Sequence, residues 1–455
     1  MKKRFSYYMP EMDGLSIPEI EAMLAPRLRE QLKYCYDSSR YYKEKFKQAG
    51  AELGDIQTFE DLRKLPVFMT KEDERACQEE SRQKLGHTFG THLCAPVDEL
   101  YLTGTTSGTT GVPTFTYTFT KNDLDFLAPR LAHRLALCGV GKGDRGLFCF
   151  TLGIYATTMT LWGLRLLGAL PIDIDARAGT DTFLKFADLT RPTHLACTPS
   201  LALYLIEKCP KMLGYPVSEL KLKGLLTTGE PGIANPAIKK TLEESYQCPS
   251  FDYWSPAGHA PGISCLSDEY QGLHAIAPEV CTSYFDLIDP ISGESVPLED
   301  GAVGQMVHTS LHREACPLVK YAYGDVVKIF LGECPSCGFK GIRAKLVGRA
   351  DDMLIVKGVN VYPAAVRTEV MKFKPQVTGQ MRIVLDSPPP RVEPPLKLKV
   401  EYQGNLDQRE LDALAEKIAQ AVHDTLRMRP KVIMVPEGDL PRHTRKTPVF
   451  EKAYE

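Results

Sequence analysis

Short apolar runs alternate with helix-length segments through one stretch of the chain. The runs span residues 146–150, 170–174, 194–197 and 224–227. The helix-length segments span residues 156–167, 182–190, 200–208 and 237–245. Strands separated by helices form βαβ units, because each helix carries the chain back to the start of the next parallel strand. The pattern therefore predicts an α/β fold with a largely parallel sheet, whose ligands gather beyond the carboxyl ends of the strands.

A loop rich in hydroxyl groups precedes this region. Residues 103–117 read TGTTSGTTGVPTFTY, and six of the first nine are Ser or Thr. Glycines allow close backbone approach to a ligand, and the amides and hydroxyls can surround a polyanion. The loop is not a Walker loop, because no Gly-Lys-Ser/Thr follows at the required spacing. Since it follows the apolar run 100–102, we expect it at the carboxyl end of a strand of the parallel sheet; the alternative is a flexible linker.

The two ends of the chain differ from this central region. Ser16-Ile-Pro-Glu19 is a capping box, and a helical stretch follows it to about Lys47. After Gly348 the pattern predicts strands at 381–385, 396–402 and 431–435, and a helix at 406–427. We therefore expect a large N-terminal domain, residues 1–348, with mixed or parallel sheets and helices. A small α+β domain, residues 349–455, would follow it.

Composition excludes several classes of protein. A net charge of −2 gives no basic field for nucleic acid. The chain contains no run of eighteen apolar residues, so the sequence predicts no membrane-spanning helix. The N-terminus lacks the apolar core of a signal peptide. Most of the thirteen cysteines stand singly, which is typical of reduced thiols. We expect a cytoplasmic enzyme.

Five segments, taken in order, carry a family resemblance. They are residues 103–114, 228–232, 321–325, 348–363 and 440–446. Together they resemble the adenylate-forming superfamily of acyl- and aryl-CoA synthetases, luciferases and peptide-synthetase adenylation domains. Within it, the chain is most similar to phenylacetate–CoA ligase and its relatives. Thr114, where most of the superfamily has Lys, favours this branch.

The resemblance implies a two-step reaction. A carboxylate attacks the α-phosphate of ATP, which gives an acyl-adenylate and pyrophosphate, and a thiol, usually that of coenzyme A, then displaces AMP. The first step depends on positioning and on stabilisation of phosphoryl charge, with Mg²⁺ as the implied metal. The small domain would be mobile and would rotate between the steps about Asp351. Gly358 would line the passage of the pantetheine arm.

The resemblance also assigns roles to individual residues. Lys446 would be catalytic, because an ammonium there offsets the repulsion between the carboxylate and the α-phosphate. Asp325 would accept both ribose hydroxyls, and Arg349 would contact ribose or phosphate. The complete implied ATP/AMP site is Ser107, Gly108, Thr109, Thr110, Gly111, Gly229, Glu230, Pro231, Asp252, Tyr253, Asp325 and Arg349.

One segment departs from the family pattern. Where relatives end Tyr-Gly-x-Thr-Glu, this chain reads Tyr-Trp-Ser-Pro-Ala from Tyr253 to Ala257. Ala257 therefore lacks the carboxylate that helps to hold magnesium. The implied acyl pocket is formed by Tyr155, Trp254, Ser255 and Ala257.

A Cys-x-x-Cys knuckle predicts a structural zinc site. Cys334 and Cys337 supply half of a tetrahedral ligand set. Cys265 matches a cysteine of several relatives of phenylacetate–CoA ligase, and His259 would complete the set, with His274 or Cys316 as alternatives to His259. The other interpretation is a turn with two free thiols.

These features lead to one hypothesis and two rivals. The hypothesis is an ATP-dependent acid–thiol ligase that joins an aromatic or related carboxylic acid to coenzyme A. One rival passes the acyl group to a carrier-protein thiol or another acceptor. The other is a nucleotide-binding pseudoenzyme, suggested by Ala257. A homodimer is the commonest symmetric assembly, and the sequence leaves open whether this chain forms one.

Overall fold

The N-terminal part of the protein is helical. The computed structural model describes residues 15–106, 113–151, 157–230, 232–254, 262–275, 283–441 and 449–454. Its first helices are α2 (Ile17–Ser38), α3 (Arg40–Gln48), α4 (Phe59–Lys64) and α5 (Lys71–Lys84). The capping box of α2 is confirmed, since the Glu19 carboxylate accepts the backbone N–H of Ser16 at 2.8 Å. Ser39 has an extended backbone and divides the expected helical stretch into α2 and α3.

The central region forms the parallel half of a large sheet. Its strand order is β5–β4–β6–β7–β8. The strands are β4 (Arg145–Phe150), β5 (Leu170–Asp175), β6 (His194–Cys197), β7 (Gly224–Thr227) and β8 (Ser250–Trp254). The helices between them are α7 (Thr157–Leu166), α8 (Thr180–Thr190), α9 (Pro199–Leu213) and α10 (Pro236–Tyr246). The four predicted strands and four predicted helices of this region are confirmed, and so is the α/β fold class.

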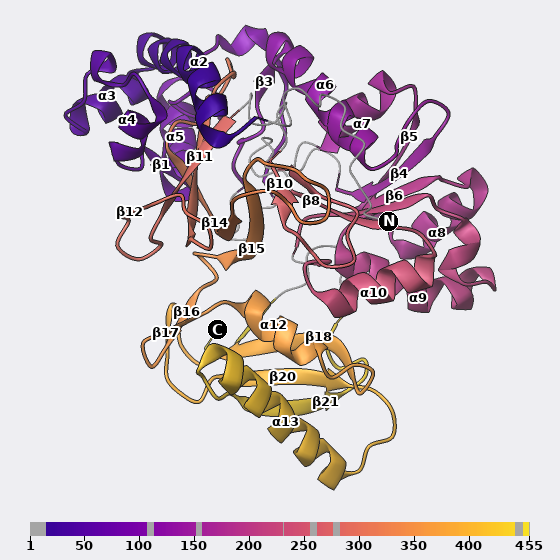
Figure 1. Cartoon of the computed structure of the whole chain (residues 1–455). Coiled ribbons are helices and arrows are strands. Elements are labelled where there is room, and N and C mark those ends of the chain that lie inside the picture. The colour runs from indigo at the N-terminus through magenta and orange to yellow at the C-terminus, as the bar shows by residue number, and fades with distance from the viewer. Residues whose placement is uncertain are drawn as a thin grey trace.

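Alternate residues of these strands enter two different cores. Leu147, Leu195 and Leu225 pack with residues of α8, α9 and α10. Phe148 and Ala196 point to the opposite face and pack with residues of α7 and of α6 (Lys121–Leu137). Successive side chains of a strand point to opposite faces, so helices cover the parallel half on both sides. Figure 1 shows α8, α9 and α10 grouped together beside this half of the sheet.

The same sheet continues into an antiparallel half. After β8 the order runs β9–β10–β15–β14–β13–β11–β12, and β1 (Met69–Thr70) pairs in parallel with β14. The strands are β9 (Gly262–Ser264), β10 (Leu273–His274), β11 (Ser283–Ile288), β12 (Ser295–Val296), β13 (Val303–Ser310), β14 (Tyr321–Phe330) and β15 (Arg343–Arg349). The mixed sheet thus has thirteen strands in the described part of the chain.

The strand before the hydroxyl-rich loop lies outside the large sheet. β2 (Leu100–Leu102) pairs antiparallel with β3 (Phe119–Thr120) in a separate two-stranded sheet. The expectation that this strand belongs to the parallel sheet is therefore wrong. The described residues on either side of the loop also pair, as in the bond from Gly104 N–H to the Tyr117 carbonyl at 2.9 Å, so they form the base of a hairpin.

The C-terminal part forms its own sheets and core. One sheet contains β16 (Leu354–Val356), β17 (Val359–Val361) and β19 (Arg391–Val392). The other has the order β21–β20–β18–β22, formed by β18 (Val377–Leu385), β20 (Lys397–Tyr402), β21 (Lys431–Pro436) and β22 (Phe450–Lys452). Helices α12 (Pro363–Met371) and α13 (Gln408–Leu426) pack on it. This unit lies below the large sheet in Figure 1. The small α+β unit is confirmed, and its boundary at residue 348 stays a prediction.

No helix of the described chain combines the length and apolar character that a membrane span requires.

Two leucines of α8 give a matched test of this packing. Leu184 is fully buried in the core between α8 and the sheet, whereas Leu189 is 78% exposed. We expect Leu184→Ala to lower the free energy of unfolding by about 2–5 kcal/mol, because it leaves a cavity in a packed core. Leu189→Ala, the control, should change it by less than about 0.5 kcal/mol. Urea denaturation measures both, and equal effects would contradict the assigned face of α8.

Candidate functional site

The base of the hydroxyl-rich loop is a ladder of threonines. The backbone N–H of Thr106 donates to the Thr114 carbonyl at 2.9 Å, and the two side-chain hydroxyls lie 3.0 Å apart. The Thr114 hydroxyl lies 2.8 Å from that of Thr116. The tip of the loop, with Ser107, Gly108, Thr109, Thr110 and Gly111, lies outside the described residues. The described base holds the two strands of the hairpin in register.

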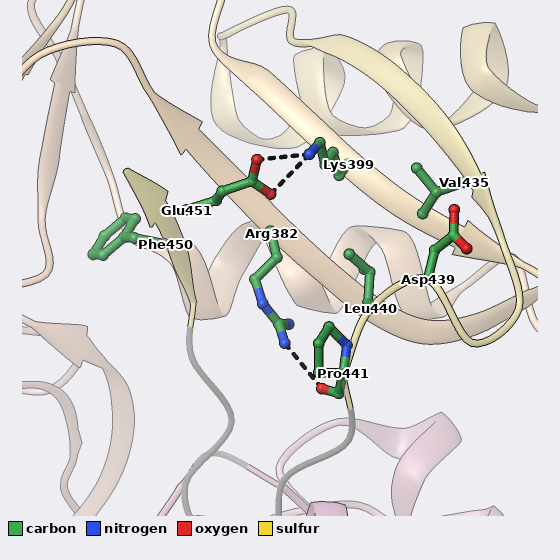
Figure 2. Close-up of a pocket in the computed structure, with 8 residues that line it drawn as sticks. All are labelled: Arg382, Lys399, Val435, Asp439, Leu440, Pro441, Phe450 and Glu451. Atoms are coloured by element: carbon green, nitrogen blue, oxygen red, sulfur yellow. Dashed lines mark hydrogen bonds and ion pairs between the residues drawn. The ribbon is translucent and has the colours of Figure 1, made fainter. Parts of the chain in front are cut away.

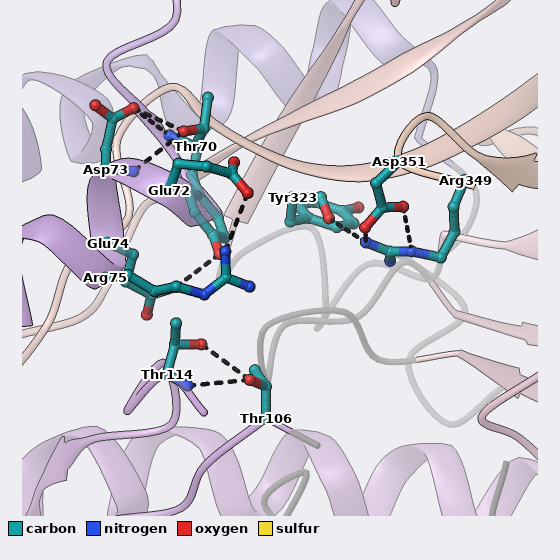
Figure 3. A network of polar contacts seen from close by, with 11 residues as sticks. Thr70, Glu72, Asp73, Glu74, Arg75, Thr106, Thr114, Tyr323, Arg349 and Asp351 are labelled. Carbon is teal, nitrogen blue, oxygen red and sulfur yellow. Dashed lines mark hydrogen bonds and ion pairs between the residues drawn. The ribbon is translucent and has the colours of Figure 1, made fainter. Parts of the chain in front are cut away.

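Helix α5 anchors this base through a buried carboxylate. Glu74 is fully buried, accepts the Thr116 hydroxyl at 2.6 Å and accepts the Tyr321 hydroxyl at 2.8 Å. Burial raises the pKa of Glu74, while the two hydroxyl donors act in the opposite direction. Gln78, one turn further along α5, accepts the backbone N–H of Phe115 at 2.6 Å. Figure 3 shows Glu74 beside the pair Thr106 and Thr114. The hairpin is therefore tied to α5 and β14.

A second carboxylate lies on β14, opposite the end of β15. Asp325 pairs with Arg349 in the antiparallel register, and Nη1 of Arg349 donates to Oδ1 of Asp325 at 2.7 Å. The same guanidinium donates twice to Asp351, at 2.7 Å each, and once to the Tyr323 carbonyl at 3.0 Å (Figure 3). Burial disfavours the charge of Arg349, but Asp325 and Asp351 raise its pKa above the ordinary value. The guanidinium thus joins the large sheet to the chain that leads into the C-terminal unit.

Gly324 makes room for this arrangement. Its backbone has φ +102°, which L side chains rarely adopt, and a Cβ there would lie 2.7 Å from Nη2 of Arg349. A side chain at this position would therefore displace the guanidinium from Asp325.

The end of β8 approaches the same carboxylate. Nε1 of Trp254 donates to Oδ2 of Asp325 at 3.1 Å. Tyr253 precedes it on β8, and the Arg134 guanidinium of α6 lies 4.7 Å from the centre of the Tyr253 ring. Asp252 accepts the Tyr270 hydroxyl at 2.7 Å. The structure therefore places Asp325 and Trp254 in contact, although 71 residues separate them.

The segment after β7 contributes a carboxylate that caps α9 and a glycine with a positive φ. Glu230 is buried, and its Oε1 accepts the backbone N–H of Ser200 at 2.7 Å, within the first turn of α9. A carboxylate there satisfies a free N–H and complements the helix dipole. Gly229 has φ +90°, a conformation that favours glycine. Both residues thus have structural roles, and their predicted contact with adenine stays a prediction.

Gly358 lies in a tight hairpin between β16 and β17. Lys357 and Gly358 have φ values of +50° and +79°, as two-residue β-hairpin turns of type I′ require. A Cβ on Gly358 would meet nothing within 4 Å. The turn alone accounts for the glycine, so its role in a pantetheine passage stays a prediction.

The segment that leads to Lys446 is held by a buried carboxylate of β20. Glu401 accepts the backbone N–H of Leu440 at 3.1 Å, and Nη2 of Arg382 donates to the Pro441 carbonyl at 3.2 Å. A cavity of about 330 Å³ lies beside this segment (Figure 2). Lys446 lies outside the described residues, so its catalytic role stays a prediction.

Four buried metal-ligand side chains meet at the junction of β9, β10 and the loop after β14. The ligand atoms of Cys265, His274, Cys334 and Cys337 all lie within 4.8 Å of one another. Nδ1 of His274 lies 3.1 Å from the Gly272 carbonyl, and its Nε2 lies 3.3 Å from the Cys337 sulfur. A carbonyl can only accept, so the proton is on Nδ1 and Nε2 faces the sulfurs. Contacts with the thiols of Cys265 and Cys337 lower the pKa of Cys334.

The fourth member of this cluster is His274, one of the two predicted alternatives to His259; the other, Cys316, is not part of the cluster. Several other predicted site residues lie, like His259, outside the described residues: Tyr155, Pro231, Ser255 and Ala257. Sequence reasoning missed Glu74 and Arg134, and neither lies in a recognisable motif. A buried carboxylate or guanidinium acquires its role from distant segments, so no local signal marks it.

Comparisons with known proteins place this geometry in context. Residues 358–451 match the family model described as AMP-binding enzyme C-terminal domain. The chain is 30% identical to phenylacetate-coenzyme A ligase of Thermus thermophilus, over 96% of each chain. It is 29% identical to the Escherichia coli enzyme of the same name, over 87% of this chain and 82% of that one.

A solved structure shows the same fold. A 2-hydroxyisobutyryl-CoA ligase, in the postadenylation state in complex with 2-HIB-AMP, superposes with a TM-score of 0.84 at 24% identity. The match covers 97% of this chain and 91% of that one.

The buried carboxyl group of Asp252 should make the stability of the fold depend on pH. Burial raises its pKa from 3.8 to about 6, although the Tyr270 hydroxyl acts in the opposite direction. The folded state therefore holds this proton more tightly than the unfolded state, and stability falls as pH rises from about 4 to 7. Relative to Asp252→Asn, the wild type should lose at most about 3 kcal/mol of unfolding free energy across this range.

Urea denaturation at four pH values measures the difference between wild type and variant. Asp412→Asn, an exposed substitution on α13, is the control for the substitution itself. A difference between wild type and Asp252→Asn that stays constant over this pH range would contradict the assignment.

Proposed function

Because the chain belongs to the phenylacetate–CoA ligase family of adenylate-forming enzymes, we propose that it joins an aromatic or related carboxylic acid to coenzyme A at the site around Asp325. The carboxylate attacks the α-phosphorus of ATP, and the bond to the bridging oxygen breaks to release pyrophosphate. The thiol of coenzyme A then attacks the acyl carbon, loses its proton, and displaces AMP. The products are acyl-CoA, AMP and pyrophosphate.

The position of Asp325 is the observation that best supports the proposed nucleotide site. Asp325 presents a buried carboxylate at a point where β8, β14 and β15 come together. Its two oxygens bind Arg349 and Trp254, and carboxylate oxygens can accept further hydrogen bonds from a ribose diol. Tyr253 precedes Trp254 and carries the Arg134 guanidinium near its ring, so the ring is positioned before a ligand arrives. We assign adenine to Tyr253 and ribose to Asp325.

The threonine hairpin is the proposed phosphate site. Its base is fixed to α5 through Glu74, which is consistent with a loop whose donors are held in place before the phosphates bind. Lys446 would then bring an ammonium to the reacting carboxylate. Magnesium stays a proposed cofactor, held mainly by phosphate oxygens and water, since Ala257 offers no carboxylate.

The proposed motion of the C-terminal unit is supported by its separate core. The unit has its own sheets and is joined to β15 next to Arg349 and Asp351. A hinge needs few residues, and Asp351 is the proposed one. A carrier protein as acyl acceptor and a homodimer are further proposals.

An acid panel tests the function. Purified protein is mixed with ATP, Mg²⁺, coenzyme A and a series of aryl, arylacetic and short aliphatic acids, and AMP release and loss of free thiol are measured. We expect an aromatic acid to give equal amounts of AMP and thioester. AMP without loss of thiol would favour a different acceptor. No AMP with any acid, despite ATP binding, would contradict the proposal.

We also propose that Cys265, His274, Cys334 and Cys337 hold a structural zinc ion. Sulfur ligands about 2.3 Å from a tetrahedral zinc lie about 3.8 Å from one another, which is compatible with the spread of at most 4.8 Å in this cluster. Four protein ligands leave no open position for catalysis. The ion would connect the β9–β10 segment to the loop between β14 and β15.

Metal analysis tests the zinc proposal. We expect about one zinc per chain. Cys265→Ser should lose the metal and lower the melting temperature, because a folded-state ligand is lost. Cys248→Ser is the control, since Cys248 is also buried but lies outside the cluster. Purified protein without zinc, and equal melting temperatures for the two variants, would show that the cluster is a set of free thiols.

A further inference from the structure

Both oxygens of the Asp325 carboxylate already accept a hydrogen bond from the protein. Nη1 of Arg349 donates to Oδ1 at 2.7 Å, and Nε1 of Trp254 donates to Oδ2 at 3.1 Å. A carboxylate can accept about four hydrogen bonds, shared equally by its oxygens. An acceptor position therefore remains on each oxygen, which matches the pair of hydroxyl donors in a ribose diol.

The indole contact fixes the rotation of this carboxylate. The χ2 torsion of an aspartate is broad and roughly two-fold, so a donor on one oxygen leaves the plane of the group free to turn. The Arg349 guanidinium is such a donor, since its described contact with Asp325 is to Oδ1. A second donor on Oδ2 defines the plane, and Trp254 supplies it.

The indole is itself held in place. Trp254 is the last residue of β8 and pairs with Gly262 of β9. Its half-buried ring packs against a core that β11, β13 and β14 share and that includes Tyr323. Successive side chains of a strand point to opposite faces, and Tyr253 accordingly lies beside Arg134 of α6. The two aromatic residues that end β8 therefore serve different parts of the site.

This donor distinguishes the chain from the family pattern, which has Gly at the position of Trp254. A glycine offers no side-chain N–H, so Oδ2 of Asp325 would lack this partner. The sequence places Trp254 in the acyl pocket, and its ring can still border the acid. The N–H, however, is directed to the carboxylate on β14. An indole N–H only donates, so it suits a carboxylate that has to stay an acceptor.

We infer that Trp254 is a positioning residue of the nucleotide site, whose indole N–H holds the Asp325 carboxylate so that both oxygens face the ribose hydroxyls. This inference rests on the proposed function, because it assumes that ribose binds at Asp325. It predicts a preference for ribonucleotides: 2′-deoxyATP leaves one acceptor of a fixed carboxylate unpaired, which weakens binding. A carboxylate that is free to turn adapts to a single hydroxyl, so the preference decreases.

Calorimetric titration of Trp254→Phe with ATP and 2′-deoxyATP tests the inference, because Phe keeps an aromatic ring and removes the N–H. We expect the dissociation constant for ATP to rise about threefold to thirtyfold, up to the loss of one hydrogen bond to a charged group. The constant for 2′-deoxyATP should rise less, so that the ratio of the two constants falls at least about threefold. The KM for the acid at saturating ATP should change less than about twofold, since the ring is retained.

Trp162→Phe is the matched control. Trp162 is also half-buried, and it lies on α7 with its ring edge-on to Tyr101 of β2. The variant should bind both nucleotides as the wild type does. Because the chain has two tryptophans, Trp254 is the only one left in this variant. We expect saturating ATP to change its fluorescence emission, and this measurement tests the contact even if Trp254→Phe does not fold.

Three results would overturn the inference while leaving the proposed function intact. One is unchanged ATP affinity in Trp254→Phe, or unchanged emission of Trp254 at saturating ATP. The second is equal weakening of ATP and 2′-deoxyATP, which indicates that the ring supports the fold of the site. The third is a raised KM for the acid with unchanged nucleotide constants, which assigns Trp254 to the acyl pocket alone. A wild-type protein that binds neither nucleotide contradicts the proposed function, and the role of Trp254 with it.

Discussion

The carboxylate of Asp325 is the contact on which the arrangement of the site depends. It binds Arg349 at the end of β15 and Trp254 at the end of β8. The Arg349 guanidinium also binds Asp351, where the chain leaves the large sheet. This buried ion pair therefore joins β14 to the end of β15 and to the connection to the C-terminal unit, and the Trp254 contact adds the end of β8. Breaking such a pair leaves an uncompensated charge in a poorly solvated place, so the three segments keep their relative positions.

A second buried carboxylate, that of Glu74, anchors the proposed phosphate site in the same way. Glu74 connects α5 to the hairpin through Thr116 and to β14 through Tyr321. Since Asp325 also lies on β14, the same strand supports both halves of the proposed nucleotide site. Rigid supports of this kind reduce the reorganisation needed when charge develops on phosphoryl oxygens. The proposed motion between the two steps is that of the C-terminal unit.

The sequence predicts the parallel half of the sheet and the small α+β unit because strands and helices there are short, apolar and regularly spaced. The antiparallel half gives no such signal, since β11 is buried on both faces and shows no alternation. The expectation that Leu100–Leu102 belongs to the parallel sheet is wrong, because this strand pairs antiparallel with β3, which follows the hydroxyl-rich loop with no helix in the described residues between them. Glu74 and Tyr321 are 247 residues apart, and the contact of Trp254 with Asp325 is equally non-local. Local spacing also left the fourth metal ligand open among His259, His274 and Cys316, and the structure brings His274 to the cluster.

The central claim is that this site forms an acyl-adenylate before any thiol takes part. Exchange of labelled pyrophosphate into ATP, measured without coenzyme A, tests it most directly because exchange requires a reversible first step. We predict exchange that depends on an aromatic acid, proceeds without coenzyme A, and is strongly reduced in Asp325→Ala. Exchange that needs no acid, or none in the presence of an acid that the enzyme converts to its thioester, would contradict the account.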